Sequence, residues 1–267
     1  MNNDFEYECM SITKSAVGLI YFIESEFDDN FNLNSYLLNE TKPITILQTL
    51  CHRTGIENDQ SFKYDEYMNL SEKENSIEYA KETFIKAYNT QFKKTTFKYN
   101  NIAWRILVDY FYKRTHKRMK SFIRFYIPSV KFKTDKAGFI HGLNGMQLTL
   151  SGATIYAKWA ETIFRNNKDK LLIYDKISRQ ETYWGNLFGK NYNVHCFFGW
   201  FVATHIRNPT IPLAAVAIGF SSQFICVDLT KRKRRPGIQL RKEYWKKADA
   251  SVHDYAKDWM QIYNFKM

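Results

Sequence analysis

The sequence predicts a mainly α-helical protein of two lobes, with a basic cleft between the lobes. Apolar residues recur three or four positions apart along most of the chain, which is the helical period. Only 11 glycines and 5 prolines among 267 residues argue against a sandwich or barrel with many tight turns. We place the N-terminal lobe at residues 1–137 and the C-terminal lobe at 138–267, with a glycine-rich hinge where they meet.

The N-terminal lobe is expected to contain three helices. Residues 12–27 carry an apolar face and end in a polar run. Ser71 and Glu74 form a capping box, which marks the start of a second helix. The third helix covers Asn101–Ile127 and stops at Pro128, because proline cannot continue a helix.

The C-terminal lobe is also expected to be helical. Residues Leu148–Arg165 have the apolar spacing of an amphipathic helix. Phe197–His205 and Pro212–Asp228 are largely apolar, and we interpret both as buried helices. A basic loop over residues 230–237 precedes a final amphipathic helix that includes Trp245.

Charge is divided unevenly along the chain. Residues 1–90 hold 7 Lys and Arg against 16 Asp and Glu, whereas residues 91–267 hold 32 against 11. The densest stretch, Lys93 to Lys136, has 13 basic and 2 acidic side chains interleaved with aromatic residues. Phosphate groups and unstacked bases bind to such a surface, so the composition favours a nucleic-acid-binding protein.

One helix concentrates this charge. Lys113, Lys117 and Lys120 share one face of the helix over 101–127 with Arg124, and like charges repel at this spacing. We therefore expect this stripe to line the cleft and face an anion; a solvated helix face is the alternative. The expected nucleic-acid-binding residues are Lys93, Lys94, Arg105, Lys113, Arg114, Lys117, Arg118, Lys120, Arg124, Arg179, Lys190, Arg207, Lys231, Arg232, Lys233, Arg234 and Arg235.

The cluster Lys231–Arg235 allows three interpretations. It is a phosphate clamp, a nuclear-import-like patch, or a solvated loop. Tyr183 and Trp184 lie near Arg179 and are candidates for base stacking, with core packing as the alternative.

Evidence for catalysis in the sequence is weak. The nucleotide-binding, metalloprotease and GxSxG motifs are missing, and the scattered cysteines do not have zinc spacing. We expect no cofactor, no metal and no enzyme. The alternative is a Mg²⁺-dependent DNA-processing nuclease, in which Asp29 and Glu40 hold the metal and Lys42 polarises water.

One segment resembles a known family. Leu148-Thr149-Leu150-Ser151-Gly152-Ala153-Thr154-Ile155-Tyr156-Ala157-Lys158-Trp159 is similar to a helix of bunyavirus nucleocapsid proteins. The resemblance implies a non-enzymatic nucleoprotein whose two helical lobes clasp single-stranded RNA. It also implies terminal arms that join copies into a homo-oligomer, a viral polymerase as a partner, and a place in the host cytoplasm and the virion interior.

The ends and the location of the chain carry two further expectations. The most apolar run, residues 211–220, is about half the length of a membrane span, and the acidic N-terminus does not resemble a signal peptide. We expect an intracellular protein without membrane contact. Apolar residues at both ends, such as Phe5 and Phe265, favour docking on a second copy; folding back onto the same core is the alternative.

Overall fold

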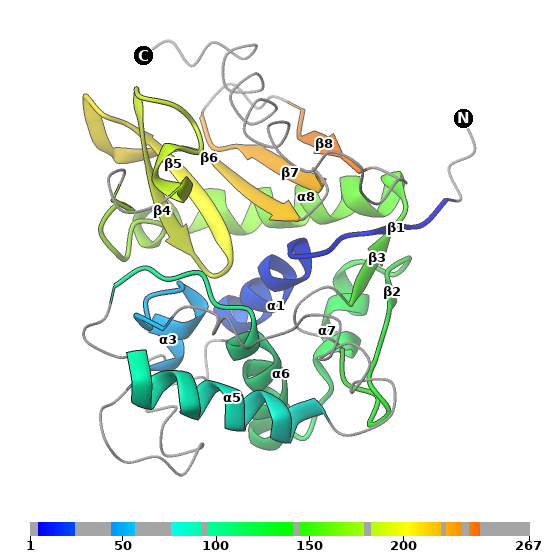
Figure 1. Ribbon diagram of the computed structural model, residues 1–267. Helices are drawn as coiled ribbons and strands as arrows, with labels where there is room; N and C mark the ends of the chain where they lie inside the picture. The colour runs from blue at the N-terminus through cyan, green and yellow to red at the C-terminus, as the bar shows by residue number, and fades with distance from the viewer. Residues whose placement is uncertain are drawn as a thin grey trace, which may run out of the picture. The chain divides into compact units, whose positions relative to one another are not determined.

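The computed structural model describes residues 5–24, 44–56, 76–91, 96–140, 145–178, 183–219, 223–230 and 235–240 (Figure 1). The chain divides into two units. One unit comprises Met1–Ile12 and Leu148–Met267, and the other comprises Thr13–Gln147. The division falls inside helix α1 (Ile12–Ile23), so this helix belongs to both.

The prediction of a mainly α-helical protein is wrong, because the first unit is built on a five-stranded antiparallel sheet. The strands follow one another in space in chain order, as a meander (Figure 1). They are β4 (Tyr192–Phe197), β5 (Trp200–His205), β6 (Asn208–Gly219), β7 (Gln223–Asp228) and β8 (Gly237–Gln239).

The segments expected to be buried helices, Phe197–His205 and Pro212–Asp228, form most of β5, β6 and β7. Every residue of β7 is buried, so both faces of the strand are apolar and the alternation typical of a half-exposed strand is lost. A continuous apolar run cannot be assigned to helix or strand by periodicity alone. The two-residue turn at Phe198 and Gly199, both with positive φ, joins β4 to β5 as a tight hairpin.

Helix α8 (Leu150–Asn166) packs against β7 and β8, and its prediction is confirmed with a start two residues later. The Thr149 side chain accepts a hydrogen bond from the Gly152 amide at 3.0 Å and caps the helix. Phe164 packs edge-on against Trp200, with ring centroids 5.0 Å apart. The covered sheet face and the helix therefore share one aromatic core.

The second unit is helical. Helix α6 is almost entirely buried and contacts α3, α5 and α7. Tyr21 of α1 donates a hydrogen bond to the Leu107 carbonyl of α6 at 2.6 Å, which ties α1 to this core. The elements are α1, α3 (Ile46–Leu50), α5 (Ser76–Gln91), α6 (Ile102–Thr115), α7 (Met119–Tyr126), β2 (Lys131–Phe132) and β3 (Met146–Leu148).

The helix predicted over Asn101–Ile127 is two helices rather than one. His116 adopts a left-handed conformation with φ of 56° and ends α6, and α7 begins at Met119. Because α6 ends at Thr115 and α7 begins at Met119, Lys113 and the cations of α7 do not belong to one continuous helix. The continuous helical period from which the basic stripe was deduced is therefore wrong, and nucleic-acid binding by these residues stays a prediction.

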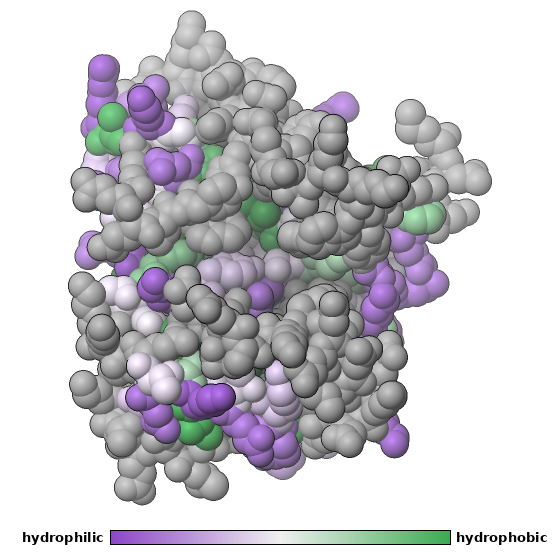
Figure 2. Space-filling view, in the orientation of Figure 1, coloured by the Kyte–Doolittle hydropathy of each residue, from purple (hydrophilic) through white to green (hydrophobic). Residues whose placement is uncertain are grey.

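A smaller sheet has the order β1-β3-β2, with β1 at Tyr7–Glu8. Two 3-10 helices, η1 (Lys168–Lys170) and η2 (Tyr183–Asn186), follow α8. Among the described helices, none has the length and hydrophobicity to cross a membrane. On the face seen in Figure 2, hydrophobic residues form small areas among hydrophilic ones.

Candidate active site

The chain places Ser11-Ile12-Thr13-Lys14 where a strand turns into a helix. Strand β1 ends at Glu8, and α1 begins at Ile12, whose amide donates to the Cys9 carbonyl at 3.0 Å. Met10 has φ of 50°, a left-handed conformation that is uncommon for residues other than glycine. The turn therefore presents Ser11 at the N-terminal end of α1 in a locally strained backbone, a feature that often marks functional sites.

Ser11 and Lys14 are three positions apart at the start of α1. Residues at this spacing lie on the same side of a helix, so Ser11, just before the first residue of α1, and Lys14, in its first turn, are placed on one side. Ser11 is partly exposed, whereas Lys14 is 1% exposed. The Thr13 hydroxyl between them accepts a hydrogen bond from the Met146 amide at 3.0 Å, which fixes the first turn of α1 to β3.

Burial changes the chemistry of Lys14. Removal of the ammonium group from water lowers the pKa of Lys14 from 10.5 to about 7. A large fraction of the amine is therefore neutral near pH 7, and a neutral amine accepts a proton. Lysines with this property commonly serve as general bases.

Tyr99 lies beside this amine. The Lys14 Nζ atom is 5.4 Å from the centre of the Tyr99 ring. Tyr99 is held by its neighbour Asn100, whose Nδ2 donates to the Ile56 carbonyl at 3.1 Å and whose Oδ1 accepts from the Ala103 amide at 3.0 Å. These bonds anchor the Tyr99 loop to the start of α6.

Gly219 ends β6 and lies against the turn that precedes Ser11. A Cβ atom at this position would be 2.4 Å from the Cys9 carbonyl oxygen and 3.2 Å from the Met10 Cβ. No real Cβ atom tolerates the first distance, so a glycine is required for this close approach. The C-terminal end of β6, the central strand of the large sheet, is therefore brought directly to the Ser11 turn.

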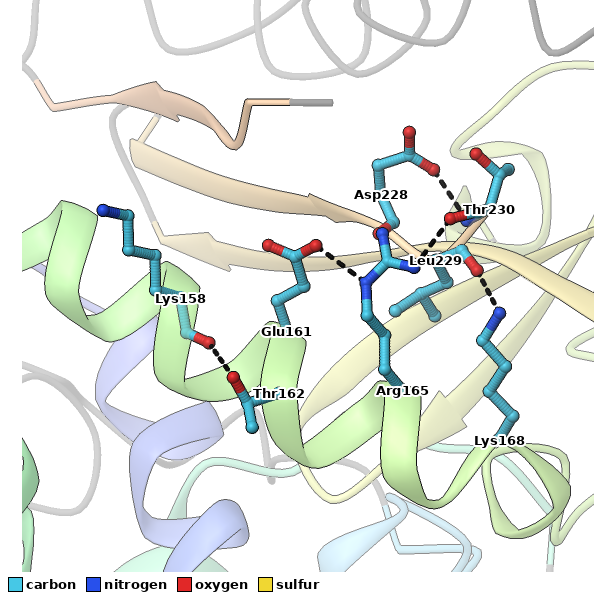
Figure 3. A network of polar contacts seen from close by, with 8 residues as sticks. All are labelled: Lys158, Glu161, Thr162, Arg165, Lys168, Asp228, Leu229 and Thr230. Carbon is cyan, nitrogen blue, oxygen red and sulfur yellow. Dashed lines mark hydrogen bonds and ion pairs between the residues drawn. The ribbon is translucent and has the colours of Figure 1, made fainter. Parts of the chain in front are cut away.

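The other end of the β6–β7 hairpin is fixed by a polar network on α8 (Figure 3). Arg165 donates to the carbonyls of Asp228 and Thr230 at 2.7 Å each, and its Nε donates to Glu161 at 2.7 Å. Lys168 donates to the Leu229 carbonyl. The partner strand of β6 in this hairpin, β7, is thus anchored to α8 at its C-terminal end.

The structure separates the predicted nucleic-acid-binding residues into different environments. Arg105 is fully buried and forms an ion pair with Asp135 at 2.7 Å, so it cannot reach a ligand in solvent. Lys113 is exposed and lies 3.8 Å from the Asp109 carboxylate. Arg118 donates to the Ala137 carbonyl at 2.8 Å, and Lys120 is partly buried. The exposed members are Arg114, Lys117, Arg124, Lys190, Arg207 and Arg235.

Several predicted residues lie outside the described ranges. They are Lys93, Lys94, Arg179, Lys231, Arg232, Lys233 and Arg234, the nuclease candidates Asp29, Glu40 and Lys42, and the capping box of Ser71 and Glu74. In the described ranges, Arg118 and Lys120 do lie together, over the turn at Gly138. Among described residues, no cluster of acidic, histidine or cysteine side chains is able to hold a metal.

Comparison with known proteins identifies the fold. No protein-family model matches the sequence, and no curated protein matches it. An octameric penicillin-binding protein homologue from Pyrococcus abyssi superposes with a TM-score of 0.66 and 14% identity, over 98% of this chain and 67% of that chain. The chain has the fold of penicillin-binding proteins and β-lactamases.

Two further solved structures show the same fold. A putative 6-aminohexanoate-dimer hydrolase from Bacillus anthracis gives a TM-score of 0.62 at 12% identity, over 98% of this chain and 73% of that chain. D-amino acid amidase from Ochrobactrum anthropi SV3 gives 0.59 at 15% identity, over 98% of this chain and 92% of that chain.

These findings contradict the resemblance to a bunyavirus nucleoprotein, and with it the predictions of RNA encapsidation and of a protein that is not an enzyme. The matched segment, Leu148–Trp159, belongs to a capped helix that covers an antiparallel sheet, which a two-lobed helical nucleoprotein does not have. The metal-dependent nuclease alternative is contradicted by the same neighbours. Self-association and an intracellular location stay predictions.

The residues that matter here were missed. Serine followed three positions later by lysine is a known signature of β-lactamases and penicillin-binding proteins. This signature is present in the sequence at Ser11 and Lys14. The motif is too short to stand alone, but its place ahead of an apolar helix supports it. Nothing in the sequence distinguishes Tyr99 from the other tyrosines or Gly219 from the other glycines.

Proposed function

We propose that the protein is a serine hydrolase that cleaves amide bonds through an acyl intermediate on Ser11, with Lys14 as the general base. The observation that carries this proposal is the fully buried amine of Lys14, one helical turn after a serine at the start of α1. A lysine that is buried without chemical use costs stability, which makes a purely structural role a poor explanation.

The reaction follows from the properties of these two groups. The neutral Lys14 amine accepts the hydroxyl proton of Ser11 as its Oγ attacks the carbonyl carbon. The C–N bond then breaks, and the Lys14 ammonium returns the proton to the leaving amine. Water attacks the resulting ester, Lys14 accepts a proton from that water, and Ser11 recovers its hydroxyl proton as the acid departs.

The end of α1 favours the charge that develops. Backbone amide groups at a helix N-terminus carry partial positive charge, which stabilises the negatively charged oxygen of a tetrahedral intermediate. The first turn of α1 contains no acidic residue that would oppose this effect. Tyr99 contributes a ring beside the amine, where it screens Lys14 from solvent.

The similar solved structures support amides as the substrate class. They include a putative 6-aminohexanoate-dimer hydrolase, a D-amino acid amidase and a D-stereospecific amidohydrolase. At 11–15% identity these structures establish the fold, and the chemistry assigned here rests on Ser11 and Lys14.

Covalent labelling tests the proposal. The purified protein is incubated with a fluorophosphonate and, separately, with a penicillin, and its intact mass and modified peptide are determined. We expect one adduct on Ser11, absent in Ser11→Ala and retained in Ser121→Ala, a matched change at an exposed serine on α7. An unlabelled wild-type protein, or an adduct on another residue, would refute the assignment.

A further inference from the structure

His52 adopts a conformation that its residue type does not favour. It follows the short helix α3, and its φ of 53° is left-handed. Glycine or asparagine is usual at this position after a helix, because a Cβ atom makes the conformation unfavourable by about 1 kcal/mol or more. His52 is nevertheless 2% exposed, so the side chain has a defined place in the interior.

The ring of His52 is joined to the Tyr99 loop in two ways. Its Nδ1 atom accepts a hydrogen bond from the Asn100 amide at 3.0 Å. Its plane stacks on the Tyr99 ring, with centroids 4.4 Å apart and 22° between the planes. The His52 carbonyl also accepts from the Lys98 amide at 2.8 Å, so the backbone and the side chain hold the same loop.

These contacts fix the protonation of the ring. A nitrogen that accepts an amide hydrogen carries no proton, so the neutral ring carries its proton on Nε2. Burial, together with the nearby charge of Lys14, holds the pKa of His52 well below its usual value. A buried ring with Nδ1 already bonded is poorly suited to exchange protons with a substrate, and a direct catalytic role is thereby disfavoured.

We propose that His52 is a positioning residue: by stacking on Tyr99 and accepting the Asn100 amide hydrogen, it holds the Tyr99 ring against the amine of Lys14. This inference rests on the proposed function, because it assigns a second role in support of the same base. The neutral ring also completes the water-poor surroundings of Lys14 without adding a charge beside it. Loss of the ring leaves a space that water can enter, and a hydrated Lys14 amine binds its proton more tightly.

The substitution His52→Asn separates the contribution of the ring from that of the hydrogen-bond acceptor. In His52→Asn, the side-chain oxygen replaces Nδ1 as acceptor and asparagine tolerates the left-handed conformation, but the ring is lost. The matched control is His195→Asn. His195 is also buried, and its Nδ1 bonds to the Tyr174 carbonyl at 2.9 Å, within the sheet unit.

The test measures Lys14 directly. In protein with ¹³C-labelled lysine, the Lys14 resonance is assigned by its loss in Lys14→Met and followed against pH by NMR. We expect His52→Asn to raise the titration midpoint of Lys14 by about one pH unit, and to slow fluorophosphonate labelling of Ser11 at pH 7 about tenfold. His195→Asn is expected to leave both values at those of the wild type. A folded His52→Asn protein with a wild-type midpoint and labelling rate would overturn the inference.

A second measurement needs no variant of His52. In wild-type protein with ¹⁵N-labelled histidine, His52 should show an unprotonated Nδ1 and no titration between pH 6 and 8. A His52 that titrates in this range cannot keep the Asn100 bond, and that result would overturn the inference. The NMR measurements do not depend on hydrolysis, so a failure of Ser11 to label in the wild type counts against the proposed function alone.

Discussion

The start of α1 and the segment from α6 to α7 both owe their character to basic side chains, yet the two regions differ in what those side chains can do. Lys14 is a single amine removed from water, and its pKa falls to about 7. Lys113 and Lys117 are exposed to solvent, and Lys113 lies 3.8 Å from the Asp109 carboxylate. The single buried lysine is therefore better evidence for a reaction than the exposed lysines are, although the exposed lysines dominate the charge composition.

The strongest test of this contrast is the removal of each kind of lysine. Lys14→Met should slow labelling of Ser11 by a fluorophosphonate about 10³-fold, because no group remains to accept the serine proton. Lys113→Met, the same change at an exposed site on α6, should label at the wild-type rate. Equal rates for the two variants would remove the distinction between the regions.

A change at Gly219 sharpens the comparison, because it disturbs the surroundings of Ser11 without altering any charge. In Gly219→Ala the new methyl group would overlap the Cys9 carbonyl, so the turn or the strand must shift. We expect labelling about 10²-fold slower, since displacements of 1 Å at a reacting group have effects of this size. The control is Gly189→Ala, where no atom lies within 4 Å of the new Cβ and only the backbone is strained.

The pH dependence should distinguish the buried amine from every exposed one. Only neutral Lys14 accepts a proton, so the labelling rate should rise about tenfold per pH unit below 7 and level off above it. A stopped-assay rate profile from pH 5 to 9 measures the midpoint. A profile that rises only near pH 10 would mean that Lys14 has the pKa of an ordinary lysine.

The substitution Lys14→Met should change stability in the opposite direction to activity. Below pH 7 Lys14 is charged in both the folded and the unfolded state, and its burial destabilises the fold fully. Between pH 7 and 10.5 the folded state releases the proton that the unfolded state keeps, so this contribution to the free energy of unfolding rises with pH. Lys14→Met should therefore raise that free energy by up to about 5 kcal/mol at low pH, and by less as pH approaches 10.5. Denaturant titrations at pH 6 and pH 9 check this difference.

The smallest effect is expected in the basic segment. Lys117→Glu reverses an exposed charge beyond the end of α6, and exposed substitutions usually change stability by less than about 0.5 kcal/mol. Both the labelling rate of Ser11 and the melting temperature should stay at wild-type values. A marked loss of labelling would show that the segment takes part in the reaction.

The sequence was a sound guide to amphipathic helices. Helices α1 and α8 are close to their predicted positions, because each has one apolar face whose period identifies it. The same reasoning failed at β7 and at the second half of β6, where both faces are buried and no period remains. It also failed at His116, since a left-handed residue can end a helix without any glycine or proline.

Only part of the candidate site could be predicted from the sequence, and the reason is different. Ser11 and Lys14 are neighbours in the chain, so a motif can report them. Tyr99 lies beside Lys14, and Gly219 lies against Cys9 and Met10, although each comes from a distant segment of the chain. In addition, the charge composition emphasises the many exposed basic residues, such as Arg124, and does not reveal the single buried amine of Lys14.

The division of the chain has a consequence for its biosynthesis. The turn that carries Ser11 is made by the ribosome before the strand that supports it, β6. Cys9 can therefore meet Gly219 only after the chain between them has been made and has emerged. Contacts between such distant segments slow folding. We expect labelling of Ser11 by a fluorophosphonate to arise only after translation has passed β7.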